Sequence, residues 1–255
     1  MKFNIWLTGD VHHISMVNSY DKIKLNNRGL DISEVDLCDQ YLKISNQYGF
    51  EPTLFFTGKT IEEETEKIKQ LISKYKFSIG GHTYSAYEPI LLSKISKRLF
   101  DRPFLNKNHK YKDIIKTYSI IDKLLGVKIK YWRNHAYESD VNTNNILSEL
   151  GFTRVSNEVN LNFSYCQNLD NKLFSYPINT LPDHENLIHS DECQGGIHVS
   201  KWVDKNINYV KNIKKKNGTA TLLLHPLCMF LENEFYYMKK LLSNIYTLSN
   251  SNLPL

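Results

Sequence analysis

Four polar side chains stand directly after short apolar runs, and their types could together perform hydrolysis. A carboxylate in such a place can remove a proton from water, and an arginine beside it keeps it ionised. An imidazole can donate a proton or bind a divalent metal. The residues placed in this way are Asp10, His82, Arg133 and His225. The sequence therefore predicts acid–base chemistry if the fold brings these four side chains together.

A recurring unit of a strand followed by a helix would bring them together. Strands are expected at residues 3–8, 53–57, 77–79, 127–132, 153–155, 174–178 and 220–224. Helices are expected from the N-cap Ser33 to Gly49, after a capping box of Thr60 and Glu63, at 113–125, from Asn142 or Thr143 to Gly151, at 202–213 and at 235–248. Repeated units of this kind imply parallel strands with right-handed crossovers, and α/β barrels carry their chemistry at the C-terminal ends of such strands. A Rossmann sheet shares the alternation, but no GxGxxG follows the first strand, which disfavours a nucleotide site.

Composition and charge favour a single domain over residues 1–255. Hydrophobic residues make up 41% of the chain, which is enough for a large core. The net charge of +5 is modest, and the basic run at 214–216 is typical of a helix end, so no nucleic-acid partner is expected. No segment approaches the roughly 18 apolar residues of a membrane helix. The start of the chain has no signal-like apolar segment and the cysteines lack CxxC spacing, so we expect reduced thiols in a cytoplasmic protein; the cysteines are Cys38, Cys166, Cys193 and Cys228.

Five motifs, in order over nearly the whole chain, resemble those of the polysaccharide deacetylases, the family with NodB homology. Any one match would be weak evidence, but five in the family's order and spacing are fairly specific. They are residues 7–12 (LTGDVH), 52–58 (PTLFFTG), 79–85 (IGGHTYS), 132–137 (WRNHAY) and 222–226 (LLLHP). The resemblance implies a distorted (β/α) barrel with about seven parallel strands.

The resemblance also implies roles for the four polar residues. In the family an aspartate is the general base, an arginine orients it and the last histidine is the general acid. One aspartate and two histidines hold a divalent metal, for which zinc is the expected ion. Asp10 matches the base, Arg133 its partner, His225 the acid and His82 the first metal histidine.

The metal ligands depart from the family pattern at two places. Ala86 stands four residues after His82, where the second histidine is expected. Val11 and His12 follow Asp10, where the metal aspartate is expected. Alanine cannot bind a metal, whereas imidazole suits zinc, iron or nickel. We therefore expect His12 and His82 as metal ligands.

The third ligand stays open between Asp10 and a residue of the stretch 181–189. That stretch takes the place of the family's fourth motif, in which an aspartate usually orients the acid histidine. His13 is an alternative to His12, because adjacent residues of an extended segment point to opposite sides and only one is expected to face the site. The side chains expected to contact the substrate are Tyr84, His135, Tyr137, Asp183 and His184.

Each of the four polar residues also has a purely structural interpretation. Asp10 could cap a turn, and His82 could bond to the backbone of one. His225 could be a satisfied core histidine, and Arg133 a structural ion-pair partner. Their place in the motif order favours a functional role for all four.

The function expected from this pattern is metal-assisted hydrolysis of a carbon–nitrogen bond that is not a peptide bond. The favoured substrate is an N-acetylated or otherwise N-acylated sugar or glycoconjugate. A second hypothesis is hydrolysis of another such bond, in a formamide, cyclic ureide or imide. A third is a catalytically inactive barrel that binds glycans, which Ala86 supports and the retained Asp10, Arg133 and His225 oppose.

Overall fold

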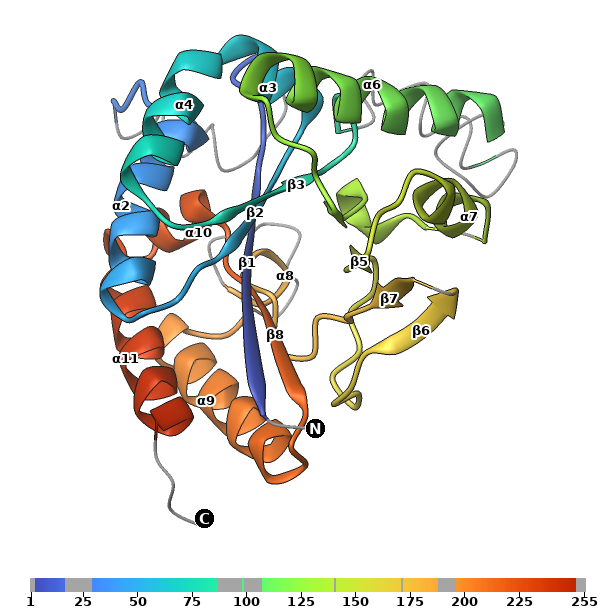
Figure 1. The fold of residues 1–255 in the computed structure, drawn as a ribbon. Coiled ribbons are helices and arrows are strands. Elements are labelled where there is room, and N and C mark those ends of the chain that lie inside the picture. Colours follow the sequence, from blue (N-terminus) through green and yellow to red (C-terminus); the bar gives the residue numbers. More distant parts are fainter. Residues whose placement is uncertain are drawn as a thin grey trace.

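A curled sheet of eight strands organises the computed structural model, which describes residues 3–16, 29–86, 98, 107–139, 141–170, 172–187 and 196–250. The strand order is β6-β7-β5-β4-β3-β2-β1-β8 (Figure 1). Seven of these strands run parallel, and β6 pairs antiparallel with β7 at one edge. The strands are β1 (Asn4–Val11), β2 (Thr53–Phe56), β3 (Ser78–Gly81), β4 (Tyr131–Trp132), β5 (Arg154–Val155), β6 (Gln167–Asp170), β7 (Leu173–Ser175) and β8 (Thr219–Leu223). The expected barrel-like α/β fold with about seven parallel strands is confirmed.

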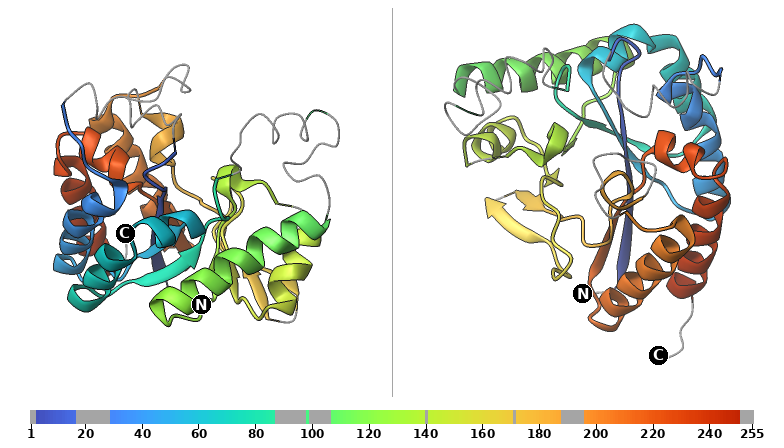
Figure 2. Two further views of the ribbon diagram at one scale, coloured as in Figure 1. Left: turned by 90° about the horizontal axis from the view of Figure 1, so that it is seen from above. Right: turned by 180° about the vertical axis from the view of Figure 1, so that it is seen from behind.

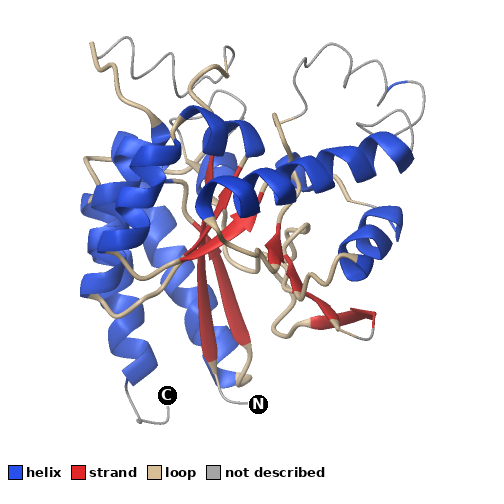
Figure 3. Ribbon diagram, turned by 45° about the horizontal axis from the view of Figure 1, so that its top comes forward, coloured by secondary structure: helices blue, strands red, loops and turns tan. Residues whose placement is uncertain are grey.

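Helices follow most strands and pack around the sheet. Figures 1 and 2 show α2, α4, α9 and α11 along one side of it, with α3 and α6 across the end where β1, β2 and β3 finish. Figure 3 shows the strands lying between these helices. The helices are α2 (Glu34–Gln47), α3 (Gly58–Glu63), α4 (Thr65–Lys74), α6 (Lys107–Leu125), α7 (Val141–Glu149), α8 (Asp183–Asn186), α9 (Val199–Lys215), α10 (Pro226–Leu231) and α11 (Tyr236–Asn250).

The register of the parallel strands sets the level at which polar side chains emerge. Val11 pairs with Phe56, Phe56 with Gly81, and Gly81 with Trp132. The residues that follow these four partners therefore leave the sheet at one edge. Central strands that are covered on both faces are made of nearly continuous apolar runs, and all four residues of β2 are buried.

Some expected elements differ from the structure. The capping box of Thr60 and Glu63 is wrong, because Thr57 caps α3 and accepts from the amide of Thr60. The hydroxyl of Thr60 instead contacts the hydroxyl of Thr57, at 2.6 Å, and α4 begins separately at Thr65. The strand expected at 127–132 pairs only over its last two residues.

Four elements of the described residues were not expected at all: β6, the 3₁₀ helix His135–Tyr137, α8 and α10. Ser33, by contrast, caps α2 as expected, in a capping box closed by Asp36. No helix of the described residues is long and apolar enough to cross a membrane. Cys38, Cys166 and Cys228 form no disulfide in the part of the chain that the structure describes, and Cys193 lies outside that part.

Candidate active site

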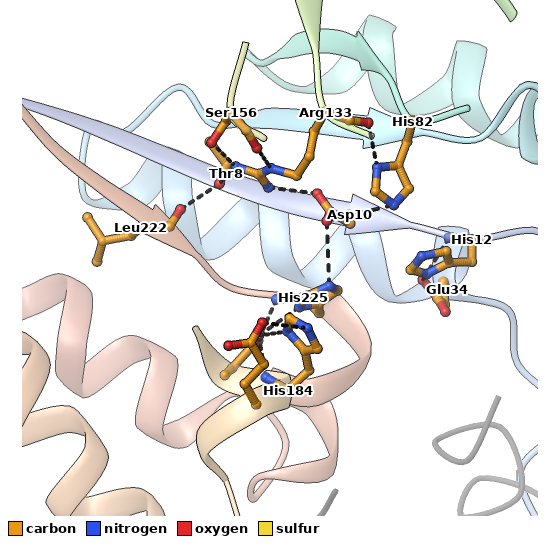
Figure 4. A network of polar contacts seen from close by, with 12 residues as sticks. Thr8, Asp10, His12, Glu34, His82, Arg133, Ser156, His184, Leu222 and His225 are labelled. Carbon is orange, nitrogen blue, oxygen red and sulfur yellow. Dashed lines mark hydrogen bonds and ion pairs between the residues drawn. The ribbon is translucent and has the colours of Figure 1, made fainter. Parts of the chain in front are cut away.

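Asp10 and Arg133 form a buried ion pair where β1 and β4 end. Arg133 Nη1 donates to Asp10 Oδ1 at 2.7 Å, and both side chains are almost fully buried. The other two nitrogens of this guanidinium group are also engaged (Figure 4). Nη2 donates to the hydroxyls of Thr8 and Ser156, both at 2.9 Å, and Nε donates to the carbonyl oxygen of Ser156 at 3.0 Å. Burial alone would raise the pKa of Asp10, but Arg133 and the nearby histidines outweigh it and lower that pKa well below its usual value. Asp10 is therefore an ionised, rigidly held carboxylate.

The second carboxylate oxygen of Asp10 faces two imidazoles. Oδ2 lies 3.8 Å from His82 Nε2 and 3.7 Å from His225 Nε2. Figure 4 shows these rings on opposite sides of Asp10, one from the end of β3 and the other from the end of β8. Because Oδ1 is held by Arg133, Oδ2 is the oxygen that can take a proton from a molecule bound between the rings.

His225 is held by a second buried carboxylate. Its Nδ1 lies 2.7 Å from Asp183 Oδ1, and its backbone amide donates to Oδ2 of the same residue. Burial would lower the pKa of His225, but Asp183 outweighs it and raises that pKa to about 9. His225 therefore carries a proton at neutral pH, with Nε2 directed at Asp10. Asp183 lies behind this ring, fully buried, and not on the side expected to face a substrate.

Three further ring contacts join His12, His82 and His135 into one cluster. The ring centroids lie 5.3 Å apart for the pairs of His12 with His82 and with His135, and 5.4 Å apart for His82 with His135. Each ring offers a nitrogen within 4.8 Å of the other two. Burial, followed by neighbouring charges, lowers the pKa of His82 to about 3 and that of His135 well below its usual value. Both are therefore neutral imidazoles, the form that binds metals.

Hydrogen bonds fix the tautomers of two of these rings. His82 Nδ1 lies 2.9 Å from the carbonyl oxygen of Arg133. His12 Nδ1 lies 3.2 Å from Glu34 Oε2, and the same oxygen accepts from the His12 backbone amide at 2.8 Å. His12 Nε2 is buried without a hydrogen-bond partner. His13, as expected for its neighbour in an extended segment, is directed elsewhere and lies 3.3 Å from the hydroxyl of Thr57.

The remaining predicted substrate contacts divide into two groups. Tyr137 and His184 lie beside the site, with ring centroids 6.2 Å apart, and His184 packs on His225 at 4.6 Å. Tyr137 Oη is buried without a hydrogen-bond partner, so it can bind a molecule that enters, whereas His184 Nδ1 lies 3.7 Å from Asp183 Oδ1. Tyr84 instead donates its hydroxyl to Glu62 of α3, and Lys116 of α6 lies over its ring, so both parts of this side chain are already engaged.

Three residues of the site were not predicted: Thr8, Glu34 and Ser156. Ser156 follows the strand expected at 153–155, so the rule that identified Asp10 could have found it. Glu34 stands in the first turn of α2, where acidic residues are common because they favour the helix dipole, and nothing in the sequence distinguishes it.

The residues present fit a divalent transition metal, although not through the family's usual ligands. Val11 is buried in the apolar core and Ala86 is 2% exposed, and neither has a ligating atom. His12 and His82 lie beside Asp10 with Nδ1 engaged and Nε2 directed inward, as in many protein sites where a second group orients a metal-binding imidazole. The donor set is made of imidazole nitrogens, which suit zinc and its neighbours.

A comparison of the sequence with protein families finds a match to the polysaccharide deacetylase model over residues 20–155. This range contains His82 and Arg133, while Asp10 and His225 lie outside it. Among curated protein sequences, none matches the chain.

Several solved structures share the fold. A Mycobacterium smegmatis protein assigned to the polysaccharide deacetylases has 15% identity and a TM-score of 0.73, over 97% of this chain and 85% of its own. The Puue allantoinase has 11% identity and a TM-score of 0.71, over 98% and 85%. A Pseudomonas aeruginosa PAO1 protein assigned to the deacetylases has 12% identity and a TM-score of 0.69, over 98% and 86%. At these identities the likeness is one of fold.

Proposed function

The chain belongs to the polysaccharide deacetylase family, and we propose that it is a hydrolase that removes an N-acetyl or other N-acyl group from a sugar or glycoconjugate. The observation that carries this proposal is the placement of Asp10. One of its oxygens is held by Arg133, and the other lies between a neutral imidazole and a protonated one. A glycan-binding module has no need of a carboxylate and an imidazolium opposed in this way.

The chain's own residues supply the proton transfers. Asp10 Oδ2 removes a proton from the attacking water, while Arg133 keeps Oδ1 engaged and the carboxylate ionised. His225, protonated through Asp183, donates from Nε2 to the departing nitrogen, so that the amine leaves as a neutral group. A divalent metal held by His12 and His82 would polarise the acyl group and acidify the water.

A second candidate function is hydrolysis of a cyclic ureide or a similar small amide. It is favoured by the likeness of fold to an allantoinase, together with Ala86 in place of the usual metal histidine. Both functions use Asp10 and His225 in the same roles. They differ in the substrate that fits beside Tyr137 and His184.

The proposal is tested by measuring the release of acid and amine from N-acetylated sugars and from small ureides, with and without added zinc. Asp10→Asn keeps the shape of the side chain and its contact with Arg133 but removes the base, so we expect a loss of about 10²–10⁴-fold in kcat/KM. Asp31→Asn, on the exposed segment before α2, is the matched control and should retain full activity.

Four outcomes separate the hypotheses. Turnover of N-acylated sugars that is lost in Asp10→Asn supports the deacetylase. Turnover of ureides alone supports the second function. Full activity in Asp10→Asn would overturn the base assignment, and a wild-type protein that binds sugars without turnover would overturn the enzyme.

A further inference from the structure

We propose that His135 completes a three-histidine site for a divalent transition metal with His12 and His82, and that Glu34 is the residue that positions His12. This inference rests on the proposed hydrolase site and names the cofactor class and ligand set of that site. It assigns His135, which the sequence analysis placed among the substrate contacts, to the metal.

The arrangement of the three rings supports a shared ligand. Their centroids form a nearly equilateral triangle with sides of 5.3, 5.3 and 5.4 Å, and one nitrogen from each ring lies within 4.8 Å of the other two. The three residues come from different segments, after β1, after β3 and after β4. No single helix or turn therefore brings all three together. Three imidazole nitrogens directed to one place form a set that zinc binds in catalytic sites, with a further position left for water or substrate.

Glu34 gives His12 the orientation of a ligand. Its Oε2 lies near His12 Nδ1, at 3.2 Å, and also accepts from the backbone amide of His12. Nε2 is then the nitrogen that faces the cluster, and it is buried without a hydrogen-bond partner. Buried polar atoms in native proteins almost always have a partner, so this nitrogen indicates a ligand that binds here. A carboxylate behind a metal-bound imidazole is a common second partner of such sites.

The backbone that directly follows His135 is strained. Ala136 and Tyr137, the two residues that follow His135, have φ values of 49° and 58°, in the left-handed region that residues other than glycine rarely adopt. Asn134 secures the start of this turn, because its backbone amide donates to Asn157 Oδ1 at 2.7 Å. Strain that the surrounding structure maintains is typical of functional sites.

The ligand set decides which ions fit. It contains three imidazoles and no carboxylate, because Glu34 contacts the opposite nitrogen of His12 and Asp10 is paired with Arg133 as the proposed base. Magnesium and calcium prefer oxygen ligands, whereas zinc, cobalt, nickel and iron accept imidazole. We therefore expect the site to bind these transition metals and to ignore magnesium and calcium.

The experiment is a titration of metal-free protein with cobalt(II) and with zinc, without substrate. The readouts are the visible cobalt spectrum, which reports coordination, and the dissociation constant from calorimetry. The wild type should bind about one equivalent. His135→Ala and His82→Ala should each weaken binding by at least about 100-fold and change the spectrum, and Glu34→Gln should weaken it by about 10–100-fold. His109→Ala, an exposed histidine on α6, is the matched control and should bind as the wild type does.

Wild-type affinity and spectrum in His135→Ala would overturn the inference, as would a wild type that binds neither metal. His135→Gln, which keeps most of the volume of the ring, repeats the test if the alanine variant does not fold. Because no substrate is present, a protein that binds metal in this way but hydrolyses nothing leaves the site standing and removes the proposed function. A protein that hydrolyses its substrate but binds no metal supports the proposed function and overturns the metal site.

Discussion

At the scale of single residues, the pair of His225 and Asp183 decides the pH range in which a proton is available for the departing amine. Asp183 is fully buried and contacts both Nδ1 and the backbone amide of His225. Burial by itself would favour the neutral ring, and the carboxylate reverses this and raises the pKa of His225 to about 9. The proposed acid should therefore stay protonated up to about that pH and lose its function above it.

Asp183→Asn tests this assignment because it removes the negative charge and keeps the size of the side chain. Without the carboxylate, the pKa of His225 should fall toward or below the ordinary histidine value of about 6.5, since burial then acts with much less opposition. In the wild type, kcat/KM should decline as the pH rises through about 9, and in the variant the decline should begin at a lower pH. A pH–rate profile from 5.5 to 10 measures both limits. An unchanged alkaline limb would exclude His225 as the titrating acid.

The residues that the sequence could identify are those placed by a simple rule. Asp10, His82, Arg133 and His225 each leave the sheet where a parallel strand ends, so the structure brings them to one edge as expected. His135 follows the end of β4, and the chain then turns through positive φ values at Ala136 and Tyr137, which neither residue type predicts. The sequence could therefore place His135 near the site, but it could not show that this ring joins those of His12 and His82.

At the scale of elements, a carboxylate of α6 binds the turn after β3. The backbone amide of Tyr84 donates to both oxygens of Asp113, at 3.2 and 3.1 Å. Burial outweighs this bond and the charge of Lys116, and raises the pKa of Asp113 to about 7. Near neutral pH the folded protein therefore holds a proton here that the unfolded chain has already released.

This raised pKa makes a prediction about stability and pH. Between pH values of about 4 and 7 the folded state binds more protons at Asp113 than the unfolded state does, so its contribution to the free energy of unfolding falls as the pH rises. Asp113→Asn cannot titrate, and its stability relative to the wild type should therefore increase from pH 5 to pH 8. The increase should amount to no more than about 1.4 kcal/mol for each unit of pKa shift. Urea unfolding of both proteins at the two pH values measures it, and a constant difference between them would contradict the prediction.

The elements that could be predicted are those whose composition follows from burial. Strands β1, β2 and β8 are apolar runs because helices or neighbouring strands cover both of their faces. Strand β6, with the sequence QNLD, has three exposed residues out of four and shows neither an apolar run nor an alternation. The second part of the chain that was missed, α8, has only four residues and is too short to show a helical period.

At the scale of the whole molecule, the chemistry and the main stabilising contacts lie in different places. The polar residues of the site gather at the C-terminal edge of the parallel strands, as in barrel enzymes generally. Much of the apolar burial lies in the helical layer outside the sheet, for example where α11 packs on α9. A substitution in that layer should reduce stability without changing the geometry around Asp10.

Leu241→Ala on α11 tests this separation. Leu241 is fully buried in the core cluster, and truncation of such a leucine costs about 2–5 kcal/mol through lost burial and the cavity left behind. Lys240→Ala, at the exposed neighbouring position of the same helix, should change stability by no more than about 0.5 kcal/mol. Chemical unfolding gives both values, and kcat/KM is measured well below the unfolding temperature of the weaker variant. Because α11 contributes no side chain to the site, kcat/KM should stay the same in both variants, whereas Asp10→Asn should lose activity. A fall in kcat/KM for Leu241→Ala under those conditions would mean that packing on the far side of α10 helps to hold His225 in place.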